Sequence, residues 1–122
     1  MKKSIMKKWV KALRSGEYVQ GKGALCRVGE KYDYFCCLGV LTDIYMQEIG
    51  DLNIGTIGSI MGKDIQYDFY IGSLPPKVRK WSGVKSGTGA FKRTSLSYIN
   101  DSSRNKSFKE IADIIERNWE KL

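Results

Sequence analysis

One stretch, YDYFCCLGVLTDIY from Tyr32 to Tyr45, constrains the fold most, because apolar and small residues run through it with almost no charged break. Its apolar side chains recur at the spacing of a helix that is buried on a wide face; they are Cys37, Leu38, Val40, Leu41, Ile44 and Tyr45. The pattern predicts a buried helix from Phe35 onward, entered from a strand. Gly39 inside it lowers helix propensity and therefore indicates a close backbone crossing.

Amphipathic helices are predicted at both ends of the chain. From Ser4 to Arg14 an apolar stripe faces one side and lysines face the other, with Ser4 as the expected cap and Gly16 as the end. A surface helix packed on the core is favoured over a helix that binds a membrane or tracks nucleic acid. Near the C-terminus Ser107 and Glu110 form a capping box, followed by the stripe Phe108, Ile111, Ile115, Trp119 and Leu122.

Strand patterns lie between these helices. Residues 18–20 and 24–28 read as strand pieces separated by glycines, and a turn at 29–31 leads into residues 32–35. The Gly21-Lys22-Gly23 step resembles half of a phosphate loop, but a bulged hairpin explains it more simply.

The second half of the chain continues with less regular patterns. Residues 48–63 have the glycine spacing of a turn-rich connection or an irregular strand. Residues 64–70 alternate as a half-buried strand, with Ile65, Tyr67 and Phe69 on one side. A short helix is expected from Pro76 to Trp81. Together these patterns predict one α+β domain over residues 1–122, a small antiparallel sheet packed with helices at the N-terminus, centre and C-terminus.

Composition narrows the function classes. The formal charge of +8 and pI near 9.4 favour anionic partners, such as nucleic acid, nucleotides, an acidic protein or a membrane surface. The chain contains no histidine, which excludes a His-based triad and an imidazole metal site within it. Three cysteines, two of them adjacent, suggest reduced thiols in a cytosolic protein. No apolar run has the length of a membrane span or the form of a signal peptide.

No residue constellation dictates a chemistry, so binding is the expected activity. Flat faces for a base are offered by Tyr18 and Trp81, and cations for phosphate by Lys22, Arg27, Lys92 and Arg93. The Gly- and Ser-rich segment 82–95 either closes over an anionic ligand or is a solvated loop, the latter being favoured. Cys36, at a helix N-terminus, is a reactive thiol or a core residue, and core packing explains it better. No catalytic residue, metal ligand or cofactor is predicted.

Four blocks carry a family resemblance: ALRSGEYVQGKGAL, YFCCLGVLTDIY, LPPKVRKW and YINDSSRNKSFKEIADIIE. They resemble a group of small accessory proteins encoded by tailed phages and prophages, over most of the chain. The opening helix and Gly-rich hairpin are also loosely similar to phage anti-defence sponges for cyclic nucleotides. The resemblance implies a location in the host cell cytoplasm and no catalytic residues.

The resulting hypothesis is a noncatalytic phage anti-defence protein that sequesters an anionic nucleotide signal, such as a cyclic nucleotide, without cleaving it. The protein is expected to be a homo-oligomer, since small pockets are often completed at subunit interfaces. Three alternatives remain open: an inhibitor that binds an acidic surface of a host defence protein, a basic domain that binds nucleic acid, and an enzyme that cleaves a phosphodiester.

Overall fold

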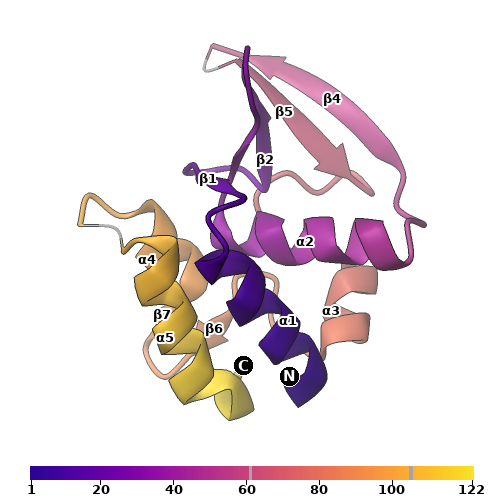
Figure 1. Ribbon diagram of the computed structural model, residues 1–122. Helices are drawn as coiled ribbons and strands as arrows, with labels where there is room; N and C mark the ends of the chain where they lie inside the picture. The colour runs from indigo at the N-terminus through magenta and orange to yellow at the C-terminus, as the bar shows by residue number, and fades with distance from the viewer. Residues whose placement is uncertain (61, 105) are drawn as a thin grey trace.

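The computed structural model describes residues 1–60, 62–104 and 106–122. A central helix, α2 (Cys37–Glu48), lies between a five-stranded sheet and the helices α1 and α3 (Figure 1). Eight residues of α2 are buried, as its apolar pattern predicted. The backbone crossing expected at Gly39 is confirmed, because a Cβ atom there would lie 1.7 Å from the carbonyl oxygen of Leu25.

The main sheet has the strand order β1-β3-β2-β5-β4. Its strands are β1 (Val19–Gln20), β2 (Cys26–Val28), β3 (Tyr34–Phe35), β4 (Ile54–Ser59) and β5 (Gly62–Tyr67). Three of the four strand pairs are antiparallel, and β1 pairs with β3 in parallel. The α+β prediction is therefore confirmed, with a mixed sheet in place of a purely antiparallel one.

The glycines after β1 do not form the expected bulged hairpin. Strand β3 lies between β1 and β2, so the segment 21–25 crosses from one side of β3 to the other. Gly21 permits this crossing, since a Cβ atom there would come within 2.8 Å of the Cβ of Tyr34. The crossing explains the glycine without a phosphate ligand.

Helix α1 (Lys3–Arg14) buries the predicted stripe, and Trp9 at its centre donates a hydrogen bond of 2.9 Å from Nε1 to the carbonyl oxygen of Cys37. The predicted cap is wrong: the helix begins at Lys3, its N-cap residue is Lys2, and Ser4 already lies in the first turn. Gly16, with φ of +78°, follows the helix end as expected.

Strand β5 ends earlier than the alternating pattern suggested. Asp68 and Phe69 both have positive φ and form a tight turn, closed by the two hydrogen bonds that Tyr67 and Tyr70 exchange. Phe69 is therefore 83% exposed and does not face the core with Tyr67. Residues 48–63 contain β4, in agreement with the irregular-strand alternative, and Met61 lies outside the described residues.

The remaining elements lie on the side of α2 away from the sheet, where α3 and α4 pack on α2 and α5 packs on α1 (Figure 1). They are α3 (Pro76–Ser82), the hairpin β6 (Ala90–Phe91) and β7 (Thr94–Ser95), α4 (Leu96–Asp101), α5 (Phe108–Asn118) and the short 3-10 helix η1 (Trp119–Lys121). The capping box of Ser107 and Glu110 is present at the start of α5. Helix α4 was not predicted. No helix in the described part of the chain is long and apolar enough to cross a membrane.

Candidate anion-binding surface

Three of the six predicted site residues, Tyr18, Lys22 and Arg27, lie in and before β2. The Tyr18 ring packs edge-on against Phe35, with ring centroids 5.1 Å apart, and its hydroxyl donates to Asp43 over 2.5 Å. Burial, with this hydrogen bond, raises the pKa of the Tyr18 hydroxyl. The ring and the hydroxyl of Tyr18 thus both have contacts within the fold.

Lys22 and Arg27 are brought together, but the guanidinium of Arg27 is already bound. Its Nε donates to Asp64 Oδ1 over 2.8 Å, and its Nη1 donates to the carbonyl oxygen of Lys22 over 3.3 Å. Asp64 is 8% exposed, so this ion pair is largely shielded from water. Removing one partner would leave a buried charge, which gives Arg27 a structural role.

The other three predicted residues, Trp81, Lys92 and Arg93, fall within residues 76–95. Trp81 contacts Tyr45 edge-on at 5.3 Å and packs against the core, so its role is that of a core anchor. Lys92, with φ of +52°, and Arg93 occupy the turn between β6 and β7, and both side chains are exposed. The predicted residues therefore lie on three different parts of the fold, namely the segment around β1 and β2, helix α3, and the turn between β6 and β7.

A different feature unites the cations: two segments hold all of the protein's excess positive charge. Residues 1–16 and residues 76–95 each contain six Lys or Arg and no Asp or Glu, while the rest of the chain has a net charge of −4. The segments are in contact, because the amide of Lys2 donates to the carbonyl oxygen of Ser82 over 2.7 Å. We call the twelve cations of these two segments the cationic surface.

Most of the cationic surface has no acidic partner. Lys8 pairs with Glu48, Arg14 with two acids of α5, and Lys77 with Asp51. Within the described residues the other nine cations form no ion pair. They are Lys2, Lys3, Lys7, Lys11, Arg79, Lys80, Lys85, Lys92 and Arg93. Such uncompensated charge produces a potential that attracts anions.

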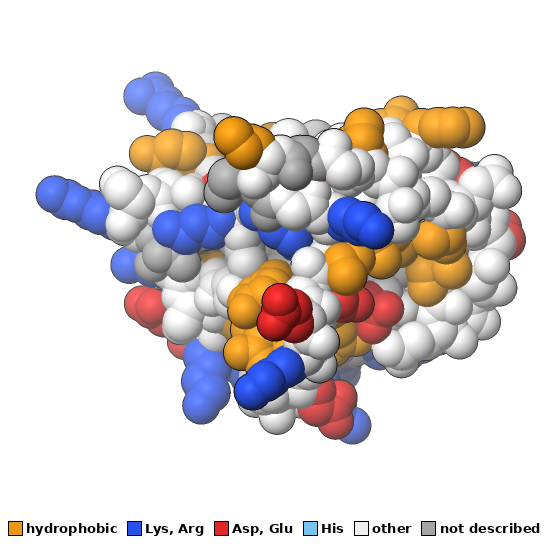
Figure 2. All heavy atoms as spheres, turned by 90° about the horizontal axis from the view of Figure 1, so that it is seen from above, with side chains coloured by type: hydrophobic (Ala, Val, Ile, Leu, Met, Phe, Trp, Pro, Cys, Tyr) orange, Lys and Arg blue, Asp and Glu red, His pale blue; other side chains and the backbone are white. Residues whose placement is uncertain are grey.

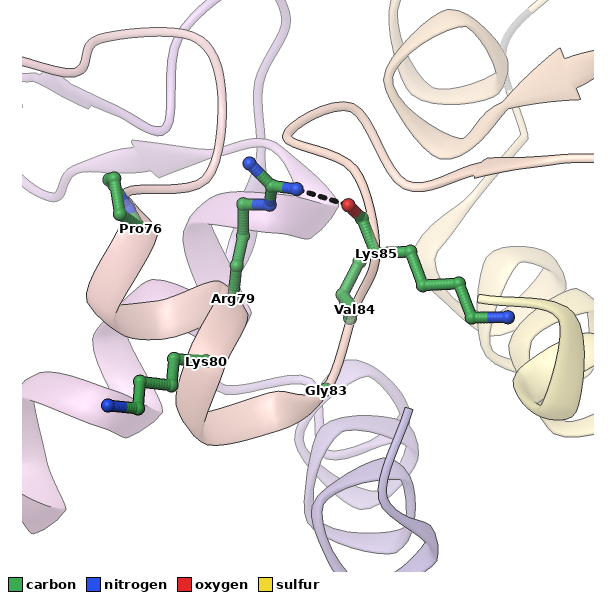
Figure 3. A pocket seen from close by; sticks show the side chains of 6 residues that line it. All are labelled: Pro76, Arg79, Lys80, Gly83, Val84 and Lys85. Atoms are coloured by element: carbon green, nitrogen blue, oxygen red, sulfur yellow. Dashed lines mark hydrogen bonds between the residues drawn. The ribbon is translucent and has the colours of Figure 1, made fainter.

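A hollow of about 360 Å³ lies in this surface at the end of α3 and is lined by Pro76, Arg79, Lys80, Gly83, Val84 and Lys85 (Figure 3). Arg79 Nη2 donates to the carbonyl oxygen of Lys85, which turns the guanidinium toward the segment after the helix. Arg79 Nε is buried and has no hydrogen-bond partner among the described residues. The amino groups of Lys80 and Lys85 point away from Arg79 on either side (Figure 3).

Comparison with known proteins places the chain in a family. A family model described as "Domain of unknown function (DUF8296)" matches residues 1–119. The chain belongs to this family. No curated protein and no solved structure matches it.

In this DUF8296 chain the thiols are core residues, as predicted. Cys36 and Cys37 are 4% and 0% exposed, and burial raises the pKa of the Cys36 thiol to about 12. A thiol with so high a pKa carries almost no thiolate at neutral pH. No group of three acidic or thiol side chains within residues 1–60, 62–104 and 106–122 has the arrangement of a metal site. Nothing in the family or in these groups points to catalysis.

Arg79 and Lys80 were not among the predicted site residues, although both lie in the LPPKVRKW block that carries the family resemblance. Candidates were chosen by residue type, as aromatic rings for a base and basic side chains for phosphate. The better signal was the absence of acids over the twenty residues 76–95, because a cation without a nearby carboxylate is available to an external anion.

Proposed function

We propose that the protein binds nucleic acid without sequence preference through the cationic surface. One observation carries the proposal: two acid-free segments that touch each other hold twelve cations, against a net charge of −4 elsewhere. Phosphate contacts from Lys and Arg supply most of the affinity in sequence-independent binding.

The shape of the surface favours a polyanion over a small ligand. On α1 the exposed residues Lys3, Lys7 and Lys11 follow each other at four-residue intervals, about 6 Å apart along the helix. The hollow beside Arg79 is shallow, and its lysines diverge. A row of separate cations suits successive phosphates, whereas a small nucleotide needs contacts that converge.

The test compares two variants of equal net charge. Lys80→Glu with Lys85→Glu alters the cationic surface, and Lys31→Glu with Lys109→Glu makes the same charge change at exposed sites elsewhere. Fluorescence anisotropy with a labelled oligonucleotide measures the affinity of each variant. The loss of affinity is expected to be at least about tenfold greater for the first pair of substitutions than for the second. Affinity of the parent should fall steeply as salt rises. Equal losses in both variants would mean that net charge alone drives binding, and the proposal would be wrong.

Sequestration of a nucleotide signal is the second candidate, and the buried Arg79 Nε is the observation that favours it. The resemblance to phage accessory proteins makes a host immune signal the ligand class to test. Arg79→Lys keeps the charge but removes this donor. A sponge would be stabilised by cyclic dinucleotides at moderate salt, would lose that stabilisation in Arg79→Lys, and would release the ligand intact on heating. Nucleic-acid binding would survive Arg79→Lys nearly unchanged.

A further inference from the structure

The sheet end of the molecule differs in character from the cationic surface. Residues 52–62 contain no charged side chain, in a chain where 28% of residues are charged. This stretch includes β4, which forms the edge of the five-stranded sheet and pairs only with β5 in the described part of the chain. Helix α2 separates this end from α3 (Figure 1).

Strand β4 lacks the features by which proteins protect a sheet edge. Natural edge strands are short, or they carry Lys, Pro or a bulge that blocks pairing with another chain. The opposite edge, β1, has only two residues. In contrast, β4 spans six residues, IGTIGS, with no charge and no proline, in an uninterrupted register with β5.

Large apolar side chains are exposed along this edge. Ile54 is 51% exposed, Ile57 is 42% exposed, and Ile60 in the turn is fully exposed. Phe69 lies beside Ile54, and both line a hollow of about 190 Å³ at the start of the strand. Seen from the sheet end, exposed hydrophobic side chains gather at several places on the surface, and charged side chains lie among them (Figure 2).

We infer that β4 pairs with β4 of a second copy of this chain, in antiparallel orientation about a two-fold axis at Ile57. The isoleucine spacing supports this register, because it sets Ile57 opposite Ile57 of the second copy and Ile54 beside its Ile60. Ile54 and Ile57 lie three residues apart and therefore point to opposite faces of β4, so each copy contributes an isoleucine to both faces of the joined sheet. Glycines at 55 and 58 leave room between them.

The self-complementary isoleucine spacing points to a second copy as the occupant, and the distribution of charge permits its approach. Two molecules of net charge +8 repel each other when their cationic surfaces approach. Pairing through β4 keeps the two cationic surfaces on the far sides of both α2 helices and brings together only uncharged strands. The same pairing satisfies the free amides and carbonyls of the edge, and no partner of opposite charge is required.

The first test measures mass against concentration by sedimentation velocity. The parent protein is expected to be a dimer at about 100 µM, and Ile57→Lys should weaken dimerisation at least about 100-fold, because each dimer loses two buried isoleucines and gains two facing charges. Ile49→Lys is the matched control: Ile49 is 49% exposed at the end of α2, and its replacement should leave the dimer intact. A monomeric parent, or a dimer that persists in Ile57→Lys, would overturn the inference.

The second test does not depend on the stability of a charged variant. Ile57→Cys places a thiol on the two-fold axis, where it should form an intermolecular disulfide under mild oxidation. The native thiols do not interfere, because all three cysteines are buried. Tyr98→Cys is the control, because Tyr98 is 68% exposed on α4, and it should stay monomeric on a non-reducing gel. Equal cross-linking of the two variants would show random collision and not the proposed pairing.

Discussion

Replacing Gly39 by Ala should destabilise the fold, although alanine is the better helix former. The new Cβ would lie 1.7 Å from the carbonyl oxygen of Leu25 and 2.6 Å from its carbonyl carbon. Both are backbone atoms of a residue that is fully buried and whose amide is bonded to the carbonyl oxygen of Ile71 over 2.7 Å. The clash is therefore with backbone atoms, and no side-chain rotation in α2 or in the segment before β2 can relieve it.

The magnitude follows from two opposing effects. Alanine gains about 1 kcal/mol of helix propensity over glycine. Overpacking a rigid core costs about 1–3 kcal/mol and occasionally more, and contact with backbone places this site at the upper end or beyond. We expect a net loss of at least about 2 kcal/mol in the free energy of unfolding.

Urea unfolding followed by tryptophan fluorescence measures this loss. Gly72→Ala is the control, because a Cβ atom at Gly72 meets only the carbonyl oxygen of Gly23, at an ordinary contact distance of 3.5 Å, and its φ is not in the left-handed region. It should change the free energy of unfolding by less than about 0.5 kcal/mol. A loss below about 1 kcal/mol in Gly39→Ala would show that α2 and Leu25 separate easily, and the argument from close approach would fail.

Three further outcomes are expected. A thiol reagent should label Cys36 and Cys37 slowly in the native protein and rapidly in urea, and fast native labelling would contradict their burial. The hydrogen bond from Tyr45 lowers the pKa of Asp51 in the folded protein. The ionised carboxylate therefore stabilises the fold fully above the pKa of about 3.9 that Asp has in the unfolded chain, and this stabilisation is lost as the pH falls through the lower pKa of the folded state. Asp51→Asn should therefore flatten the loss of stability measured in urea between about pH 4 and pH 2, and an unchanged slope would refute this role. Ser107→Ala should cost about 1 kcal/mol by removing the N-cap of α5, measured by thermal unfolding, and an unchanged melting temperature would contradict it.

The parts of the fold that could be predicted are those specified locally. The stripes of α1 and α5 and the apolar run of α2 are periodic, and periodicity reports directly which face is buried. The partner of β1 could not be predicted. A two-residue strand has no recognisable pattern, and its pairing with β3 joins residues that are fifteen positions apart in the sequence. The turn at Asp68 and Phe69 was missed since a bulky residue at positive φ goes against local preference.

The positive charge of the candidate site could be predicted from the sequence, but its location could not. The excess of cations indicated an anionic partner, yet Arg27 had the same appearance in the sequence as Arg79. Only the structure shows that Asp64, thirty-seven residues away, holds the first guanidinium, while Nε of the second has no partner among the described residues. Long-range ion pairs decide which cations remain available, and one sequence does not reveal them.

A dimer that binds nucleic acid through both cationic surfaces should prefer long strands to short ones. A dimer joined at β4 carries two cationic surfaces, so a long strand can bind both, and the second contact becomes intramolecular. A protomer of 122 residues has a radius of gyration of about 14 Å, so the two surfaces lie within about 70 Å of each other. A single strand of about 40 nucleotides spans this distance, and one of about 8 nucleotides does not.

The preference for the long strand should therefore be at least about tenfold larger in the parent than in Ile57→Lys, with the short strand bound equally by both. Ile49→Lys should keep the preference of the parent. Anisotropy titrations of both strands, at protein concentrations where sedimentation shows the parent dimeric, measure the ratio. If Ile57→Lys were monomeric and yet kept the full preference for the long strand, the two cationic surfaces would not act on the same strand. The dimer would then have a role other than the binding of nucleic acid.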